Sequence, residues 1–294
     1  MSDAVTPNPS ARTQTSGQPV GRIARRFREL AESSELGLVA YITAGDPSLD
    51  ATERIVLSTA EAGADVIELG VPFSDPVADG PTIQRASERA LRGGTTLAGV
   101  IDLVRRLRRS TEVPLVLFSY FNPILQMGLG KFAAAAAAAG ADGVLVTDVT
   151  PEEGGEYRAA MRARGLDTIF LAAPTSTDAR LALIAEASSG FLYLISRTGV
   201  TGARESLPQE LPALARRVRR FTKLPLAIGF GISLPAHVAA LGGIADAAVV
   251  GSALVSEIEK ATTPEEAARA VADRVRLLKR GAREGISRRS AGTK

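Results

Sequence analysis

Apolar, β-branched runs alternate with helical patterns along most of the chain. Each run covers four to seven residues between turn formers, which is typical of strands buried on both faces of a parallel sheet. The predicted strands are residues 38–42, 65–71, 115–119, 143–147, 168–171, 191–195, 226–230 and 247–250. The predicted helices between and after them are residues 48–62, 96–109, 131–139, 152–164, 178–188, 208–220, 235–241 and 264–280.

The number and spacing of these units predict a fold. Eight strand–helix units in about 250 residues favour a (β/α)₈ TIM barrel. The alternative is a doubly wound open sheet, which usually carries a glycine-rich fingerprint after its first strand. The segment Gly45-Asp46-Pro47 occupies that position and does not match such a fingerprint. We therefore expect the barrel.

One barrel domain is predicted over residues 21–280, with a segment on either side. Residues 1–20 are rich in Ser, Thr, Pro, Gln and Gly and predict a disordered tail. Residues 21–34 show an amphipathic helical pattern. Its apolar face consists of Ile23, Phe27 and Leu30. We expect this extra helix to cover the barrel bottom, and residues 281–294 to form a frayed, basic tail.

The second predicted strand contains a carboxylate. Glu68 interrupts the apolar run and shares a face with Val66 and Gly70, because side chains alternate along a strand. A buried carboxylate is costly unless it is paired or has a chemical role. The structural alternative is an ion pair between Glu68 and a buried Arg or Lys.

The loop after this strand carries two further carboxylates, Asp75 and Asp79. Prolines stop the strand, and Pro81 predicts the first position of a helix with Gly80 as its N-cap. The strand end and the loop thus bring three carboxylates to one rim of the barrel. Both aspartates also have structural alternatives, since Asp75 suits a turn and Asp79 suits the positive end of the next helix.

The amino-acid composition limits which side chains can serve as catalytic or metal-binding groups. The chain has no Cys and one His, which excludes disulfides and thiol catalysis and disfavours a His-based metal site or a Ser-His triad. Acid–base chemistry therefore falls mainly to Asp, Glu, Tyr or Lys. No apolar stretch reaches the ~18 residues needed to span a bilayer, and the N-terminus lacks the apolar core of a signal peptide. We expect a cytoplasmic protein.

The charge distribution gives no sign of nucleic-acid binding. The formal net charge is +3 over 294 residues. Two arginine clusters, at residues 105–109 and 216–220, both end helical patterns, where cations complement the helix dipole. No aromatic residues interleave them, so neither cluster meets the criteria for a nucleic-acid surface.

In a (β/α)₈ barrel, functional residues gather at the carboxyl ends of the strands. After the last two predicted strands, small residues let backbone N–H groups approach an anion, and a helix from Ser252 would direct its dipole there. The other small residues are Gly229, Gly231 and Gly251. The alternative is that the glycines only permit tight turns. The polar segment 197–211 suits a lid over substrate, although an ordinary flexible loop fits almost as well.

Several of these segments together resemble the signature of the tryptophan synthase alpha chain family. They are residues 68–76 (ELGVPFSDP), 78–81 (ADGP), 196–202 (SRTGVTG), 229–233 (GFGIS) and 251–253 (GSA). The resemblance runs in order from about residue 22 to about residue 280 and leaves out the N-terminal tail.

The resemblance implies a (β/α)₈ lyase that cleaves indole-3-glycerol phosphate to indole and glyceraldehyde 3-phosphate, with no metal and no organic cofactor. It places Glu68 and Asp79 in the catalytic positions. The implied phosphate-binding positions are Gly202, Gly231, Gly251 and Ser252. The implied substrate-binding positions are Tyr41, Tyr120, Tyr193 and Phe230. Tyr41 stands where the family commonly has Phe, so it adds a hydroxyl to the indole pocket.

The resemblance also implies a partner, a pyridoxal-phosphate-dependent β chain in an α₂β₂ complex. Three alternatives remain open: another phosphate-binding barrel such as a sugar-phosphate isomerase or aldolase, a stand-alone indole-releasing lyase, and a non-catalytic activating subunit. A Schiff-base aldolase needs a Lys at a strand end, and no predicted strand ends in one. The presence of both Glu68 and Asp79 argues against a non-catalytic subunit.

Overall fold

In the computed structural model, which describes residues 21–196, 207–229 and 231–291, nine parallel strands form one continuous sheet. The strands are β1 (Gly37–Thr43), β2 (Val66–Gly70), β3 (Leu115–Ser119), β4 (Gly143–Val146), β5 (Asp167–Ile169), β6 (Leu171–Ala172), β7 (Leu192–Ile195), β8 (Leu226–Gly229) and β9 (Ala247–Val250). Their order across the sheet is β5-β4-β3-β2-β1-β9-β8-β7-β6. The two edge strands are separated only by Phe170, so the sheet closes on itself.

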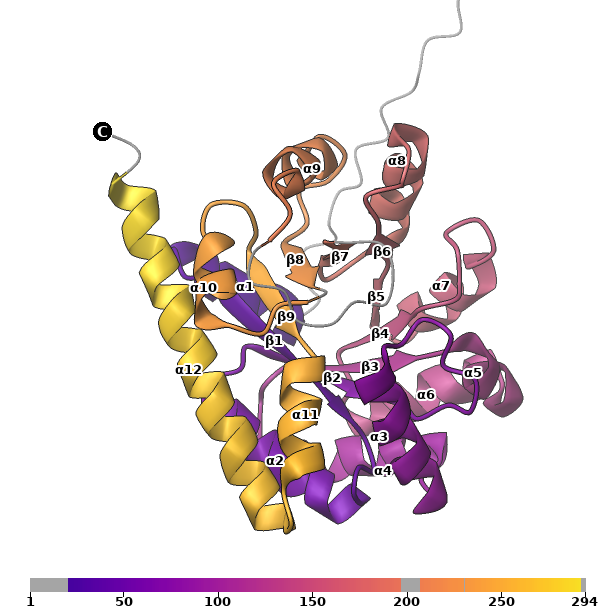
Figure 1. Cartoon of the computed structure of the whole chain (residues 1–294). Helices are drawn as coiled ribbons and strands as arrows, with labels where there is room; N and C mark the ends of the chain where they lie inside the picture. Colours follow the sequence, from indigo (N-terminus) through magenta and orange to yellow (C-terminus); the bar gives the residue numbers. More distant parts are fainter. Residues whose placement is uncertain (1–20, 197–206, 230, 292–294) are drawn as a thin grey trace, which may run out of the picture.

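This closure confirms the predicted (β/α)₈ barrel (Figure 1). The fifth predicted strand, residues 168–171, is divided into β5 and β6. The first half pairs with β4 and the second half pairs with β7, so one predicted strand serves as the seam of the barrel.

Helices surround the barrel (Figure 1). They are α1 (Arg22–Glu32), α2 (Leu49–Glu61), α3 (Pro81–Arg92), α4 (Leu97–Leu107), α5 (Phe121–Met127), α6 (Leu129–Ala139), α7 (Gly155–Arg162), α8 (Asp178–Ala187), α9 (Leu211–Arg219), α10 (Pro235–Ala240), α11 (Ser252–Lys260) and α12 (Pro264–Ala291). Side-chain caps fix several of their starts. The hydroxyl of Ser48 accepts from the Ala51 N–H at 3.1 Å, and that of Thr96 accepts from the Gly99 N–H at 3.1 Å.

Alternation along the strands separates two hydrophobic layers. One set of side chains faces the barrel interior, and the other packs against the surrounding helices. The interior set includes Val39, Val66, Val116, Leu145, Ile169, Ala227 and Val249. Ile23, Phe27 and Leu30 of α1 join this interior cluster, and the Phe27 ring lies 5.7 Å from that of Phe191. The prediction that an extra helix covers the barrel bottom is therefore confirmed.

Two helices differ from the expectations. Helix α5 was not predicted. Its first N–H, that of Phe121, donates to Asp148 Oδ1 at 2.8 Å. The start of α5 is thus capped by a residue that follows the next strand, β4. A local sequence pattern does not reveal such a distant cap. Helix α12 continues to Ala291 rather than ending at residue 280.

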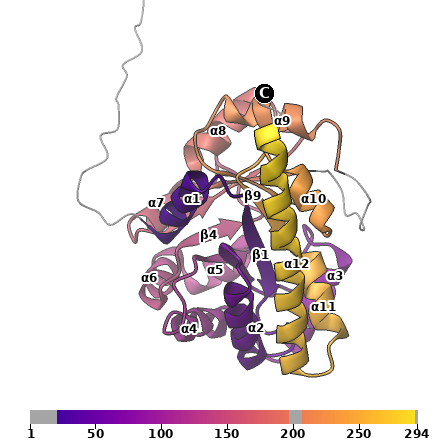
Figure 2. The same ribbon diagram turned by 90° about the vertical axis from the view of Figure 1, so that its left-hand side faces the viewer.

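Packing against α10 explains why α12 continues. Ala282 is buried, and a Cβ at Gly281 would lie 2.2 Å from the Pro235 carbonyl oxygen, so the two helices touch past residue 280. Figure 2 shows α12 running along the side of the molecule, where it contacts α2, α10 and α11. No helix among the described residues is long and apolar enough to cross a membrane.

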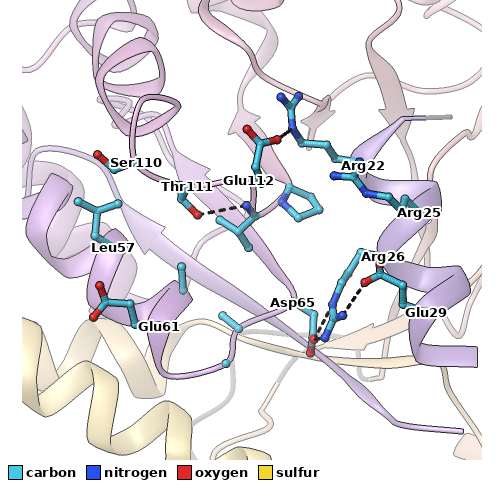
Figure 3. Close-up of a pocket in the computed structure, with 15 residues that line it drawn as sticks. Arg22, Arg25, Arg26, Glu29, Leu57, Glu61, Asp65, Ser110, Thr111 and Glu112 are labelled. Atoms are coloured by element: carbon cyan, nitrogen blue, oxygen red, sulfur yellow. Dashed lines mark hydrogen bonds and ion pairs between the residues drawn. The ribbon is translucent and has the colours of Figure 1, made fainter. Parts of the chain in front are cut away.

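The barrel bottom contains a hollow of about 520 Å³ between α1 and the ends of α2 and α4 (Figure 3). Its charged lining residues largely pair with one another. Asp65, just before β2, accepts from Arg26 at 2.6 Å and from Lys279 of α12 at 2.8 Å. It also accepts from the Leu38 N–H at 2.6 Å. These contacts join α1 and α12 to the amino ends of β1 and β2.

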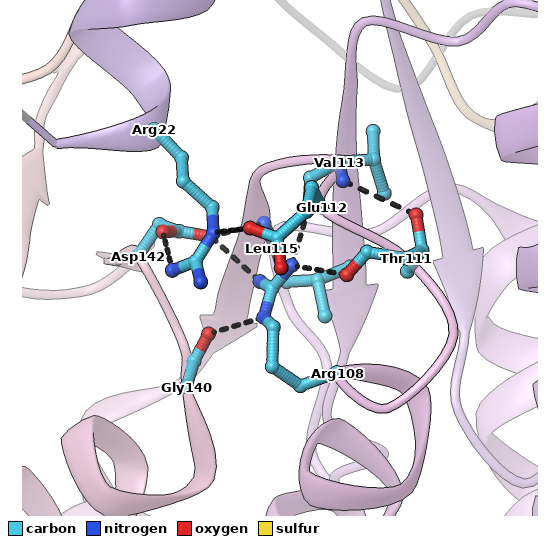
Figure 4. Close-up of polar contacts among 8 residues, drawn as sticks. All are labelled: Arg22, Arg108, Thr111, Glu112, Val113, Leu115, Gly140 and Asp142. Atoms are coloured by element: carbon cyan, nitrogen blue, oxygen red, sulfur yellow. Dashed lines mark hydrogen bonds and ion pairs between the residues drawn. The ribbon is translucent and has the colours of Figure 1, made fainter.

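A second buried network lies beside this hollow (Figure 4). The Arg108 guanidinium donates to Asp142 at 2.8 Å and to the carbonyl oxygens of Thr111 at 2.9 Å and Gly140 at 3.0 Å. Asp142 also accepts from Arg22 of α1 at 3.2 Å. Arg22, Arg108 and Asp142 therefore have structural partners, and the Arg22–Asp142 contact helps hold α1 against the amino ends of the strands.

Candidate active site

Glu68 projects into the barrel interior from the middle of β2. It shares the interior face with Val66, and its register partners are Tyr41 on β1 and Val116 on β3. Only 1% of its surface is exposed, and its Oε1 atom accepts no hydrogen bond from any described residue. Burial raises the pKa of Glu68 to about 8, because the charged form loses its hydration. Among the described residues, no Arg or Lys forms an ion pair with Glu68, which argues against the structural alternative.

Asp79 lies at the end of the β2–α3 loop, at the carboxyl end of the barrel. Its side chain is buried, and its Oδ2 accepts from the Tyr120 hydroxyl at 3.3 Å. The same hydroxyl accepts from the Ala78 N–H at 2.9 Å, so Tyr120 anchors the loop. Burial raises the pKa of Asp79 to about 6, and the bond from Tyr120 opposes that rise.

Two buried tyrosines, Tyr41 and Tyr193, lie near the two carboxyls. Burial raises the pKa of both hydroxyls, and the charges of Glu68 and Asp79 raise each further. Tyr41 is the register partner of Glu68, and Tyr193 belongs to the same interior cluster as Val66, so both phenols face the barrel interior. The Tyr41 ring also meets Phe118 edge-on, with centroids 5.1 Å apart.

Two strand glycines make room for these phenols, and sequence reasoning did not assign them that role. A Cβ at Gly70 would lie 2.1 Å from the Tyr41 hydroxyl oxygen, and one at Gly229 would lie 2.2 Å from that of Tyr193. Real side chains do not tolerate such distances, so both positions require glycine. A glycine inside a strand pattern was the available signal.

The predicted third carboxylate does not join the site. Asp75 is exposed and accepts from the Ser74 hydroxyl at 2.5 Å. The β2–α3 loop thus turns Asp79 inward and Asp75 outward, and only two of the three carboxylates face the barrel interior.

The predicted phosphate-binding residues lie on the loops after β8 and β9. Gly251 is the N-cap of α11, and Ser252 is its first residue. The first N–H groups of a helix have no partner within it and carry a partial positive charge, so this end suits an anion. Gly231 has φ = 82°, a conformation that strongly favours glycine. Gly202 and Phe230 lie outside the described residues.

Among residues 21–196, 207–229 and 231–291, no group of three or more His, Asp or Glu side chains is placed to hold a metal ion. The hollow at the barrel bottom lies at the opposite end from Asp79, because Asp65 precedes β2 whereas Asp79 follows it. The candidate site is therefore the interior of the barrel at its carboxyl end.

Comparisons with known proteins point to a single family. The family model described as tryptophan synthase alpha chain matches residues 27–283. The alpha chain of Solibacter usitatus is 57% identical over 239 residues, covering 81% of this chain and 90% of that protein. The alpha chain of Burkholderia mallei is 49% identical over 277 residues, covering 92% of this chain and 100% of that protein.

Solved structures agree as well. A structure of Mycobacterium tuberculosis tryptophan synthase superposes with a TM-score of 0.83 at 36% identity, covering 90% of this chain and 99% of that chain. Tryptophan synthase subunit alpha from Legionella pneumophila gives a TM-score of 0.81 at 35% identity, covering the same shares. The chain therefore belongs to the tryptophan synthase alpha chain family, lyases that cleave indole-3-glycerol phosphate.

Proposed function

We propose that Glu68 carries both proton transfers in the cleavage of indole-3-glycerol phosphate by this chain. The observation that supports this is a carboxyl enclosed in the barrel interior, with a pKa of about 8 and an oxygen, Oε1, that accepts no hydrogen bond from the described residues. A protonated carboxyl near neutral pH is a competent general acid, and its conjugate base is a competent general base.

The reaction moves one proton in total, from the side-chain hydroxyl to C3 of the indole ring, and Glu68 carries it in two transfers. Glu68 in its acid form donates a proton to C3 of the indole ring, which leaves a positive charge on the ring nitrogen. The carboxylate then takes the proton from the hydroxyl on the side-chain carbon next to the ring. That carbon becomes the aldehyde of glyceraldehyde 3-phosphate, and the electrons of the broken C–C bond return to the ring. Glu68 ends in the protonation state in which it began.

Asp79 has the complementary role in this proposal. As a carboxylate it accepts a hydrogen bond from the indole N–H and stabilises the positive charge that develops there. Its lower pKa of about 6 supports this assignment, because Asp79 is then ionised while Glu68 is protonated. The Tyr120 hydroxyl keeps the Asp79 carboxylate in position.

Substrate binding is proposed for the groups around these carboxyls. The phosphate would lie at the N-terminus of α11, against Gly251 and Ser252, with Gly231 on the loop after β8. Gly202, outside the described residues, is the fourth proposed phosphate contact. The indole ring would lie among Tyr41, Tyr193 and Phe230. The small apolar cluster that joins Tyr41 to Ala86 of α3 and Val255 of α11 supports an aromatic pocket beneath these two helices.

We further propose that the chain acts as the α subunit of an α₂β₂ complex and passes indole to a β chain. Val77, on the β2–α3 loop, has 85% of its surface exposed, and Leu125, on α5, has 49% exposed. The Ala78–Tyr120 hydrogen bond joins these two segments at the same rim. Exposed apolar side chains beside the site support docking of a partner there.

The test is indole formation from indole-3-glycerol phosphate by wild type and by Glu68→Gln. We expect the variant to lose ~10²–10⁴-fold in kcat and to keep its affinity for glycerol 3-phosphate, measured by calorimetry. Glu53→Gln on the outer surface of α2 is the matched control and should turn over normally. Turnover near that of wild type in Glu68→Gln would remove Glu68 from the mechanism.

A further inference from the structure

Helix α3 determines where Asp79 lies. Gly80 is its N-cap and Pro81 its first residue, so Asp79 directly precedes the helix. The side chains that α3 buries are small: Ala86, Ser87 and Ala90. Apolar burial contributes only about 0.8 kcal/mol per CH₂ group, so these residues by themselves hold α3 weakly.

Ion pairs formed by two arginines of α3 hold this helix more firmly than its few apolar contacts do. Arg89 of α3 donates through two nitrogens to the two carboxylate oxygens of Asp46, both at 2.8 Å. Arg89 also donates to Glu259 at 2.9 Å. Arg85 donates to both oxygens of Glu259, at 2.7 and 2.8 Å. Two-fold arginine–carboxylate contacts of this kind fix geometry as well as adding energy.

The two carboxylates belong to firmly held elements. Asp46 lies on the β1–α2 loop and has 1% of its surface exposed. Glu259 lies on α11, which buries the larger side chains Leu254, Val255 and Ile258. Helix α11 also begins at the proposed phosphate position. The arginines therefore attach α3, the weakly packed helix, to the element that would hold the substrate phosphate.

We propose that Asp46 and Glu259 are positioning residues for the cleavage reaction. Through Arg85 and Arg89 they fix α3 relative to α11, and so fix the loop that presents Asp79 to the indole nitrogen. This inference rests on the proposed function, because it assumes that Asp79 acts on bound substrate. The four residues touch neither substrate nor the reacting atoms in this proposal, and they act only through the placement of Asp79.

Glu259→Gln tests the inference, with Glu53→Gln as its matched control. Both glutamates have 27% of their side chain exposed, and both form ion pairs with a neighbouring helix, Glu259 with two arginines of α3 and Glu53 with one arginine of α4. Glu53 joins α2 to α4 through Arg106, and neither helix carries a proposed site residue. We expect Glu259→Gln to lower kcat by about 3- to 10-fold with unchanged glycerol 3-phosphate affinity. Glu53→Gln should change neither quantity, and thermal unfolding of both variants checks that each remains folded at the assay temperature.

The same substitution in an Asp79→Asn background shows whether the effect passes through Asp79. If it does, Glu259→Gln lowers kcat no further once Asp79 has lost its charge, because coupled residues act non-additively. The inference is overturned if Glu259→Gln has no effect alone, or lowers kcat by the same factor in both backgrounds. If Asp79→Asn itself turns over like wild type, the proposed role of Asp79 fails first, and the inference fails with it.

Discussion

At the scale of single residues, the site depends on two carboxyls that are buried in different surroundings. Glu68 lies between neighbouring strands, and its Oε1 accepts no hydrogen bond from the part of the chain that the structure describes, whereas Asp79 accepts one from Tyr120. Their pKa values are therefore raised unequally, to about 8 and about 6. Near neutral pH, Glu68 is protonated and Asp79 is ionised. An acid and an anion side by side match the two demands of the proposed reaction.

This pair predicts a bell-shaped pH dependence of kcat/KM for cleavage. The proposed acid, Glu68, must be protonated, so activity should fall as pH rises through about 8. Asp79 must be ionised, so activity should also fall as pH falls through about 6. Steady-state rates across both limbs measure this. Asp79→Asn should lose the acid limb and keep the alkaline limb, and an acid limb that survives in that variant belongs to another group.

The stability of the protein gives a readout of Glu68 that does not involve catalysis. The ordinary pKa of the carboxyl is 4.5, and the folded value is about 8, so between these values the folded chain holds a proton that the unfolded chain releases. Stability should therefore fall with rising pH across this window, at up to about 1.4 kcal/mol per pH unit. Glu68→Gln lacks this term. The free energy of unfolding, measured in urea, should rise for the variant relative to wild type as pH rises. If the free energies of both proteins change with pH in the same way, the raised pKa of Glu68 is contradicted.

Single residues differed in how well the sequence predicted them. Glu68 was recognisable because a lone carboxylate in an apolar strand is a local signal. Gly70 was not, because its requirement comes from the Tyr41 hydroxyl on the adjacent strand and depends on the register of β1 and β2. Asp75 and Asp79 share one loop, and the sequence did not show that only Asp79 turns inward. That orientation comes from Tyr120, on a different strand end.

At the scale of elements, the periodicity of apolar residues in strands and helices predicted the barrel. The residues at which some elements end depend on contacts between residues far apart in the sequence. Most predicted strands match within one or two residues because each is a short apolar run between turn formers. Helix α5 depends on a cap from Asp148, and α12 extends because α10 packs beside it. The halves of the fifth predicted strand pair with different neighbours, a feature that only the closed barrel creates.

The N-terminus of α11 gives a prediction at this scale. A Cβ at Gly251 would lie 3.5 Å from the Tyr41 Cβ, an ordinary contact, so Gly251→Ala should fold and bind almost normally. Gly251→Asp adds a negative charge where the phosphate would lie. We expect it to weaken glycerol 3-phosphate binding by at least ~10-fold, equivalent to about 1.4 kcal/mol. Calorimetry with both variants checks this, and equal affinities would mean that Gly251 serves only the turn.

At the scale of the whole molecule, the two proposed catalytic carboxyls lie on different kinds of element. Glu68 stands on a central strand, but Asp79 stands on a loop whose outer side carries the exposed Val77. A partner that packs on this rim would cover Val77 and Leu125 and hold the loop in one conformation. It would also exclude water from the barrel mouth, which strengthens the electrostatic contacts of both carboxyls.

Because Asp79 lies on a loop, we expect the isolated chain to cleave indole-3-glycerol phosphate slowly and a β chain to activate it. We expect cleavage of indole-3-glycerol phosphate to rise at least ~10-fold across a β-chain titration, equivalent to about 1.4 kcal/mol of barrier. Hydrogen exchange in residues 72–80 should slow in parallel, because docking orders that loop. Val77→Asp should weaken the response to the β chain and leave the basal rate unchanged. High turnover alone, with no response to the β chain, would instead identify a stand-alone lyase on the same barrel.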